Sequence, residues 1–413
     1  MDKVELLAPA GDLEKLKTAV DYGADAVYFG GEMFSLRAGA GNFSEEDMKQ
    51  GISYAHERGV KCHLTLNIFP HNEDLVPIEE YLRRIKDIGI DAFIVSDPGT
   101  IKTVMETVPG AEVHLSTQAN MTNRKTAEFW KDVGVSRIVL ARELTLGEIR
   151  EINGSVDIET ESFVHGAMCI SYSGRCLLSN FMTERDANRG MCAHPCRWKY
   201  RLEEEKRPGQ YYPIEEDDRG TYIMNSRDLC MIEHMADVIE SGVSSVKIEG
   251  RMKSMFYVAT VTQAYRRAID AYYEDPENYS VDPAWLEEVK KVSHREFTTG
   301  FYYNRPTNED QNYRTSDYTR DYSFVGKVLS YDSASGIAEV EQRNKMLEGD
   351  EVEIFGPGAP FFTQKITDMR DEEGNLIDAA PHPQQHVTMK MVRPVAPGYI
   401  IRKRKGEKDG CES

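Results

Sequence analysis

The chain has 413 residues, of which 40% are hydrophobic, and its mean hydropathy is -0.53. This length suits one large domain and a smaller one. No stretch reaches the roughly 18–20 apolar residues of a membrane span, and the first residues lack the layout of a signal peptide. We therefore expect a cytoplasmic protein with no membrane partner. The formal charge of -19 argues against a surface that binds nucleic acid everywhere, and leaves only local basic patches at 197–201 and 402–405.

Residues 4 to about 250 alternate short apolar runs with amphipathic stretches, which predicts strands alternating with helices and parallel pairing. The eight predicted strands are Leu6–Ala8, Ala26–Phe29, His63–Leu66, Ala92–Val95, Val113–Leu115, Arg137–Leu140, Ile158–Phe163 and Val246–Ile248. Eight strands favour a (β/α)₈ TIM-type barrel, with some distortion, over residues 1–275. An open α/β sheet is the alternative.

Helices are predicted over Asp12–Tyr22 and from Ser44, where acidic residues occupy the first turn. Residues 276–320 read as a helical linker. From about 321 to 405 the apolar period switches to two, and turn sequences separate the runs, so a small all-β barrel domain is expected there. Residues 406–413 form a charged tail.

Residues 165–222 break the periodicity, and they would follow the seventh strand, at the catalytic face of a barrel. Five of the seven cysteines fall in or near this insertion, with the spacing Cys169-x₆-Cys176-x₁₅-Cys192-x₃-Cys196-x₃₃-Cys230. Such a cluster points to metal, and ordinary core cysteines are the alternative. The absence of a Cys-x₂-Cys pair weakens a zinc ribbon, but spacing alone cannot separate iron–sulfur from zinc.

The residues around these cysteines closely resemble the signature of the peptidase U32 family. The matching segments are ESFVHGAMCISYSGRCLLS at 161–179, RGMCAHPCR at 189–197, NSRDLC at 225–230, LAPAG at 7–11 and VYFGG at 27–31. The resemblance therefore covers nearly the whole chain. The family was named for reported collagenase activity, but its better understood members are oxygen-independent hydroxylases of tRNA, of ribosomal RNA or of a quinone precursor. Length and the β domain make the chain most similar to the branch that forms 5-hydroxyuridine at the tRNA wobble position.

The resemblance implies a [4Fe–4S] cluster, prephenate as the hydroxyl donor and tRNA as the partner. The family's cluster ligands correspond to Cys169, Cys176, Cys192 and Cys230, and Cys196 matches an extra cysteine that could replace one of them. A homo-oligomer, or a hetero-oligomer with a paralogue, is compatible with this branch.

Polar residues that follow the predicted strands are candidates for the substrate site. Arginines bind a dicarboxylate through two hydrogen bonds, so the expected substrate-binding residues are Arg37, Gln118, Arg142 and Arg251. The alternative is that each arginine only pairs with a nearby carboxylate.

His165 and Glu249 are the expected catalytic residues, His165 as a proton-transfer group beside the first cluster cysteine. A structural histidine is the alternative. A protease is disfavoured, because the sequence carries no His-Glu-x-x-His or Gly-x-Ser-x-Gly motif, and a cysteine bound to a cluster is no free nucleophile.

Overall fold

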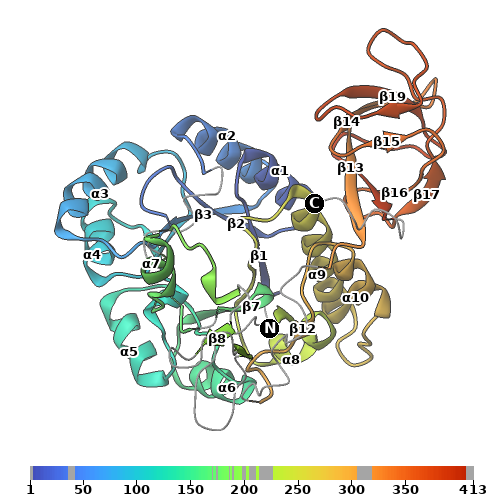
Figure 1. The fold of residues 1–413 in the computed structure, drawn as a ribbon. Helices are drawn as coiled ribbons and strands as arrows, with labels where there is room; N and C mark the ends of the chain where they lie inside the picture. The colour runs from blue at the N-terminus through green and yellow to red at the C-terminus, as the bar shows by residue number, and fades with distance from the viewer. Residues whose placement is uncertain are drawn as a thin grey trace.

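The computed structural model describes residues 3–35, 42–169, 171–173, 175–185, 187, 190–197, 201–203, 211–213, 227–304 and 319–405. The chain forms a barrel surrounded by helices, with a smaller β domain beside it (Figure 1). No helix among these residues is both long and apolar enough to cross a bilayer.

The eight predicted strands are confirmed. They are β1 (Glu5–Pro9), β2 (Ala26–Gly30), β3 (Lys61–Leu66), β4 (Ala92–Val95), β5 (Glu112–Leu115), β6 (Arg137–Val139), β7 (Glu159–Ala167) and β11 (Ser245–Ile248). Neighbouring strands pair in parallel, and β11 pairs with both β1 and β7. The sheet therefore closes on itself, which confirms the TIM-type barrel and excludes the open sheet.

Helices follow the strands and cover the outside of the barrel. They are α1 (Leu13–Asp21), α2 (Glu45–His56), α3 (Asn72–Ile85), α4 (Pro98–Thr107), α5 (Arg124–Val133), α6 (Leu146–Ser155), α8 (Met235–Glu240) and α9 (Met255–Glu274). The core between strands and helices is formed by buried apolar residues from both layers.

Helix α2 illustrates why the chain folds locally in this way. Ser44 accepts a hydrogen bond from the backbone N–H of Asp47, whose carboxylate accepts one from the Ser44 N–H. This capping box satisfies two backbone donors that the first turn leaves without partners. Met48, Ile52 and Ala55 then recur at helical spacing and are buried against the sheet. The predicted start of a helix at Ser44 is confirmed.

The cysteine-rich insertion and the residues directly after it contribute short elements. They are α7 (Leu178–Thr183), the 3₁₀ turns Pro195–Arg197 and Ile232–His234, β8 (Arg201–Glu203), β9 (Tyr211–Pro213) and β10 (Asp228–Cys230). Strand β10 pairs antiparallel with the end of β7, and β12 (Phe297–Thr298) pairs with β10. In Figure 1 helix α7 lies within the ring of outer helices, on the side of α3 and α4.

The C-terminal segment follows α10 (Pro283–Lys290) and forms a curled antiparallel sheet, as expected for an all-β module. Its strands are β13 (Tyr322–Asp332), β14 (Ile337–Gln342), β16 (Glu351–Phe355), β17 (Phe362–Lys365), β19 (His386–Lys390) and β20 (Ile400–Arg404), in the order β17-β16-β20-β13-β14-β19. A short pair, β15 (Met346–Leu347) and β18 (Ala379–Ala380), closes one side. A separate apolar core lies inside this module.

Buried charges join this module to the barrel. Arg402 has no exposed surface, and its guanidinium lies 2.8 Å from a carboxylate oxygen of Glu353 on β16 and 2.8 Å from one of Glu288 on α10. The hydroxyl of Tyr22, just after α1, donates to the carbonyl of Gly398 over 3.0 Å. The basic run 402–405 therefore begins inside a domain junction, and Arg402 is not part of an exposed basic patch.

Candidate active site

A cavity of about 590 Å³ opens at the carboxyl ends of the barrel strands. Its wall combines two groups of residues that are distant in sequence. Residues that follow strands β3, β5, β6 and β11 are Asn67, Gln118, Arg142, Glu249 and Arg251, and residues of the insertion include Cys169, Cys176, Cys192 and Cys196. Carboxyl ends of barrel strands are where TIM-barrel enzymes place their chemistry, so this cavity is the candidate active site.

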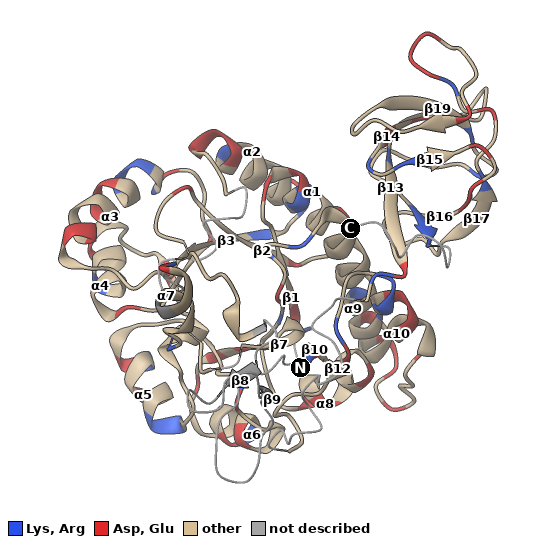
Figure 2. Cartoon of the chain, in the orientation of Figure 1, with Lys and Arg blue, Asp and Glu red and all other residues tan. Residues whose placement is uncertain are grey.

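The described wall of the cavity is rich in basic residues although the whole chain carries a net charge of -19. Among the described lining residues six are basic and one is acidic. The basic residues are Arg142, Lys247, Arg251, Lys253, Arg295 and Arg320, and the acidic residue is Glu249. Figure 2 shows acidic residues on the surrounding helices, for example α2 and α3. A cationic cavity in an acidic protein concentrates small anions.

Arg142 is held on three sides. Its guanidinium donates to the carbonyl of Ala167 and to the carboxylate of Glu249, each over 3.3 Å. It also lies over the ring of Phe163, 3.9 Å from the ring centre. These contacts fix a planar donor group at the cavity wall, as two-point recognition of a carboxylate requires.

Arg251 is only 3% exposed. It donates to the hydroxyls of Ser35 and Thr65 over 2.7 and 3.1 Å and to the side-chain oxygen of Asn42 over 3.0 Å. A Cβ atom at Gly30 would lie 2.3 Å from this guanidinium, so the close approach requires glycine at the end of β2. The glycine therefore leaves the space that the buried arginine occupies at the cavity.

Gln118 lies in a 3₁₀ turn, Thr117–Ala119, and is 5% exposed. Its side-chain oxygen accepts a hydrogen bond of 3.0 Å from the hydroxyl of Ser116. The three expected binding residues Gln118, Arg142 and Arg251 thus share one cavity with Glu249. Arg37 lies outside the described residues.

His165 does not have the expected position at the cavity. Its ring is 1% exposed and packs between Tyr257 and Tyr265 of α9 and Phe297 of β12. A ring nitrogen lies 3.2 Å from the Tyr265 hydroxyl. Burial lowers the pKa of His165 to about 3, so the ring is neutral at neutral pH. Among the described residues, those that line the cavity do not include His165.

A bulge in β7 explains this orientation. Lys247 of β11 pairs with Phe163, but the next residue, Ile248, pairs with His165, so Val164 is an extra residue in β7. An extra residue reverses the side to which the following residues point. Phe163 and Lys247 therefore line the cavity, whereas His165 faces the helices.

Four cysteines line the cavity: three of the four that the resemblance implies, and Cys196, which the sequence offered as a replacement for one of them. Cys169, Cys176, Cys192 and Cys196 contribute to the wall, whereas Cys230 lies beside His165 in β10 and is 7% exposed. Burial raises the pKa of Cys230 to about 12, and its sulfur lies 3.9 Å from the Tyr265 hydroxyl. Cys230 thus lies behind the cavity wall rather than in it.

Two of the cavity thiols accept backbone hydrogen bonds. The N–H of Leu178 points at the sulfur of Cys176 and that of His194 at the sulfur of Cys192, each over 3.4 Å. Donors of this kind stabilise thiolates and tune sulfur ligands of metal centres. The donor set, several thiols around one cavity with N–H groups directed at sulfur, fits an iron–sulfur cluster.

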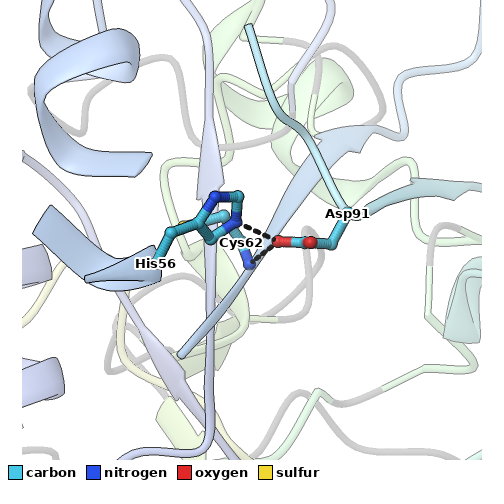
Figure 3. Close-up of side chains that lie close together, drawn as sticks. All are labelled: His56, Cys62 and Asp91. Atoms are coloured by element: carbon cyan, nitrogen blue, oxygen red, sulfur yellow. Dashed lines mark hydrogen bonds and ion pairs between the residues drawn. The ribbon is translucent and has the colours of Figure 1, made fainter. Parts of the chain in front are cut away.

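A different group has the closer spacing of a single metal ion. One ligand atom each of His56, Cys62 and Asp91 lies within 4.8 Å of the others (Figure 3). The Asp91 carboxylate already accepts from the backbone N–H of Cys62 over 2.6 Å and lies 2.8 Å from the His56 ring. Burial raises the pKa of the Cys62 thiol, so it is no thiolate. These contacts join α2 to β3, and Cys62 is a structural cysteine.

Sequence reasoning missed Lys247, Lys253 and Arg295 at the cavity. Lys247 had a usable signal, because it is a charged residue inside the short apolar run Ser245–Ile248. Arg295 follows the predicted helices in a segment with no strand pattern, so its place at the cavity depends on the tertiary fold.

Comparison with known proteins agrees with this architecture. Residues 11–312 match peptidase family U32, and residues 320–402 match the C-terminal domain of that family. "tRNA hydroxylation protein P1" of Bacillus subtilis is 47% identical over 98% of this chain and 95% of its own length. "tRNA hydroxylation protein P" of Escherichia coli is 38% identical over 92% of each chain. A protein of Porphyromonas gingivalis named "Collagenase" is 34% identical over 97% of this chain and 98% of its own. The chain belongs to peptidase family U32.

Proposed function

We propose that this protein is an RNA hydroxylase that forms 5-hydroxyuridine at the wobble position of tRNA without using oxygen. The observation that carries the proposal is the meeting of cysteines and basic residues at one cavity. Relatives named as tRNA hydroxylation proteins match the chain over nearly its full length. A tRNA substrate would place the protein in the cytoplasm.

A [4Fe–4S] cluster is the proposed cofactor. Cys169, Cys176 and Cys192 would supply three ligands. Cys230 would supply the fourth, as the family resemblance implies, and Cys196 is the alternative because it already lines the cavity. Such a cluster supplies one-electron chemistry when bound.

Prephenate is the proposed hydroxyl donor, and the basic residues of the cavity support an anionic co-substrate. Arg142 and Arg251 would bind its carboxylates, with Gln118 as a further polar contact, and Arg37, which lies outside the described residues, stays a candidate from the sequence. Glu249 would hold Arg142 in position and could exchange a proton with the ligand. His165, which packs beside Tyr265 and Cys230, would orient that region rather than contact substrate.

Deletion of the gene tests the function. Nucleosides of total tRNA from the deletion strain, measured by mass spectrometry, should lack 5-hydroxyuridine and its derivatives, and the intact gene should restore them. Unchanged tRNA nucleosides in a strain without a paralogue would contradict the tRNA assignment. Loss of a hydroxylated nucleoside from ribosomal RNA, or of a hydroxylated quinone, would show that the protein acts on that substrate instead.

A collagenase-type hydrolase is the second candidate, supported by the relative that bears this name. A hydrolase needs an activated nucleophile or a metal-bound water. His165, four residues before Cys169, packs against α9, and burial lowers its pKa to about 3, so it is a weak base that is turned away from the cavity. Release of peptides from gelatin by the purified protein, lost on substitution of Cys169, would favour the hydrolase.

A further inference from the structure

The barrel interior beneath the cavity carries a buried ion pair. Lys247 on β11 and Glu161 on β7 are 4% and 0% exposed, and the ammonium lies 2.9 Å from a carboxylate oxygen. Barrel interiors are usually filled by Val, Ile and Leu. A buried ion pair is seldom more stable than apolar side chains of the same volume. A gain in the stability of the fold therefore does not explain why this ion pair is present.

Glu161 is held from its other side as well. Its second oxygen accepts from the hydroxyl of Ser245 over 3.0 Å and lies 3.5 Å from the guanidinium of Arg137. Burial by itself would raise the pKa of Glu161, but Lys247 and Arg137 outweigh that effect and lower it. The carboxylate is thus a fixed negative charge that anchors the ammonium from below.

The ammonium of Lys247 has donors left for a ligand. It carries three N–H groups, and among the described residues its hydrogen-bond acceptor is Glu161. The rings of Tyr28 and Phe163 flank it, with centroids at 4.4 and 5.6 Å. Lys247 also belongs to the cavity wall, as do both rings. A positive donor between two aromatic rings suits an anionic oxygen on a ligand with a flat apolar part.

We propose that Lys247 binds a carboxylate of the small co-substrate at the floor of the cavity, with Glu161 as its positioning residue. This inference rests on the proposed function, because it names the part of the site that recognises the hydroxyl donor. Arg142 lies over the same Phe163 ring, so the two cations share one part of the wall. The position inside the barrel favours a small molecule over the phosphates of a polynucleotide, which lie along the outside of the strand.

The test compares variants of the anaerobically purified, iron-containing protein by calorimetric titration with prephenate. Lys247→Met alone leaves Glu161 buried without its nearest cation and can unfold the barrel, so the informative variant is Lys247→Met combined with Glu161→Met, which removes both charges. Lys247→Arg keeps the charge and moves the donors. Lys365→Met, on the outer module, is the matched control.

The double variant should bind prephenate at least about tenfold more weakly, as loss of a hydrogen bond to a charged group predicts. Lys247→Arg should also raise the KM for prephenate, while the KM for tRNA, the iron content and the control stay at wild-type values. Glu161→Gln should weaken binding less than the double variant, because the ammonium remains. A loss of iron or of tRNA affinity equal to the loss of prephenate affinity would indicate a structural role and overturn the proposal.

Wild-type affinity for prephenate in the double variant would overturn the proposal outright. The proposal would also be overturned if Lys247 were needed to bind inorganic phosphate or a short uridine oligonucleotide but not to bind prephenate. In either case nucleoside analysis of the deletion strain still decides the RNA hydroxylase function separately. Conversely, the tRNA nucleosides of the deletion strain could be unchanged while binding of prephenate still depends on Lys247. That result would reject the tRNA assignment and leave the carboxylate site standing.

Discussion

Arg142 donates a hydrogen bond of 3.3 Å to Glu249, and this contact joins the ends of two strands that lie on either side of β7. The side chains are 11% and 18% exposed, so the pair lies at the cavity surface and remains within reach of a ligand. The carboxylate limits the rotation of the guanidinium and thereby presents its remaining N–H groups to the cavity.

Substitution Arg142→Lys should lower kcat/KM for the hydroxyl donor about tenfold, because the ammonium keeps the charge but loses the planar pair of donors. Glu249→Gln should have a smaller effect, since an amide oxygen still accepts from Arg142. Hydroxylated uridine formed in tRNA at varied donor concentrations measures both. Equal activity of Arg142→Lys and wild type would show that Arg142 makes no two-point contact with the donor.

Serine substitution of Cys169, Cys176 or Cys192 should remove iron and sulfide from the anaerobically purified protein, because each would be a cluster ligand. Cys62→Ser is the matched control and should keep the iron, since this thiol is buried between α2 and β3.

The fourth ligand is decided by the same iron analysis on Cys196→Ser and Cys230→Ser. The variant that loses iron identifies the fourth ligand. If neither variant loses iron, neither cysteine is the fourth ligand. Stoichiometric zinc without iron in the wild-type protein would contradict the cluster itself.

Arg402→Met should destabilise the junction between the barrel and the β module by about 3 kcal/mol, because Glu288 and Glu353 lose a buried partner. Lys403→Met breaks a more exposed pair with Asp350 and should cost less than about 1 kcal/mol. Thermal unfolding of the two variants, followed by circular dichroism, provides the comparison. Equal midpoints would show that the Arg402 contacts contribute nothing to stability.

Stability should fall as the pH drops below about 6.5, in part because of His63. Burial, together with His114, lowers the pKa of His63 well below its usual value, so the folded state keeps this ring neutral where the unfolded chain binds a proton. The loss attributable to one such group is at most about 1.4 kcal/mol per pH unit. In His63→Leu the decline of the unfolding midpoint between pH 7.5 and 5.5 should be shallower. An identical slope in wild type and variant would assign the acid sensitivity to other groups.

The barrel strands and the start of α2 could be predicted because their signals are local. Alternating apolar runs mark the strands, and Ser44 with Asp47 marks the helix start within four residues. The clustering of Arg142, Gln118 and Arg251 also followed from a simple rule, since each comes directly after a strand whose carboxyl end faces one side of the barrel.

The positions of His165, Cys230 and Arg402 depend on contacts that the sequence pattern does not contain. The bulge at Val164 turns His165 to the helices, and only the pairing with β11 shows it. Cys230 lies behind the wall because β10 returns antiparallel to β7. Arg402 belongs to a run of basic residues typical of a surface, yet strands on both sides and α10 bury it.

The buried guanidinium of Arg402 has a consequence for any long ligand. It is bonded to Glu288 on α10 and to Glu353 of the β module, and Lys291 is bonded to the same two carboxylates, so that among the described residues four charged side chains tie α10 to the module. A polymer that touched both the module and the cavity would therefore bridge two parts of the protein that buried ion pairs hold together.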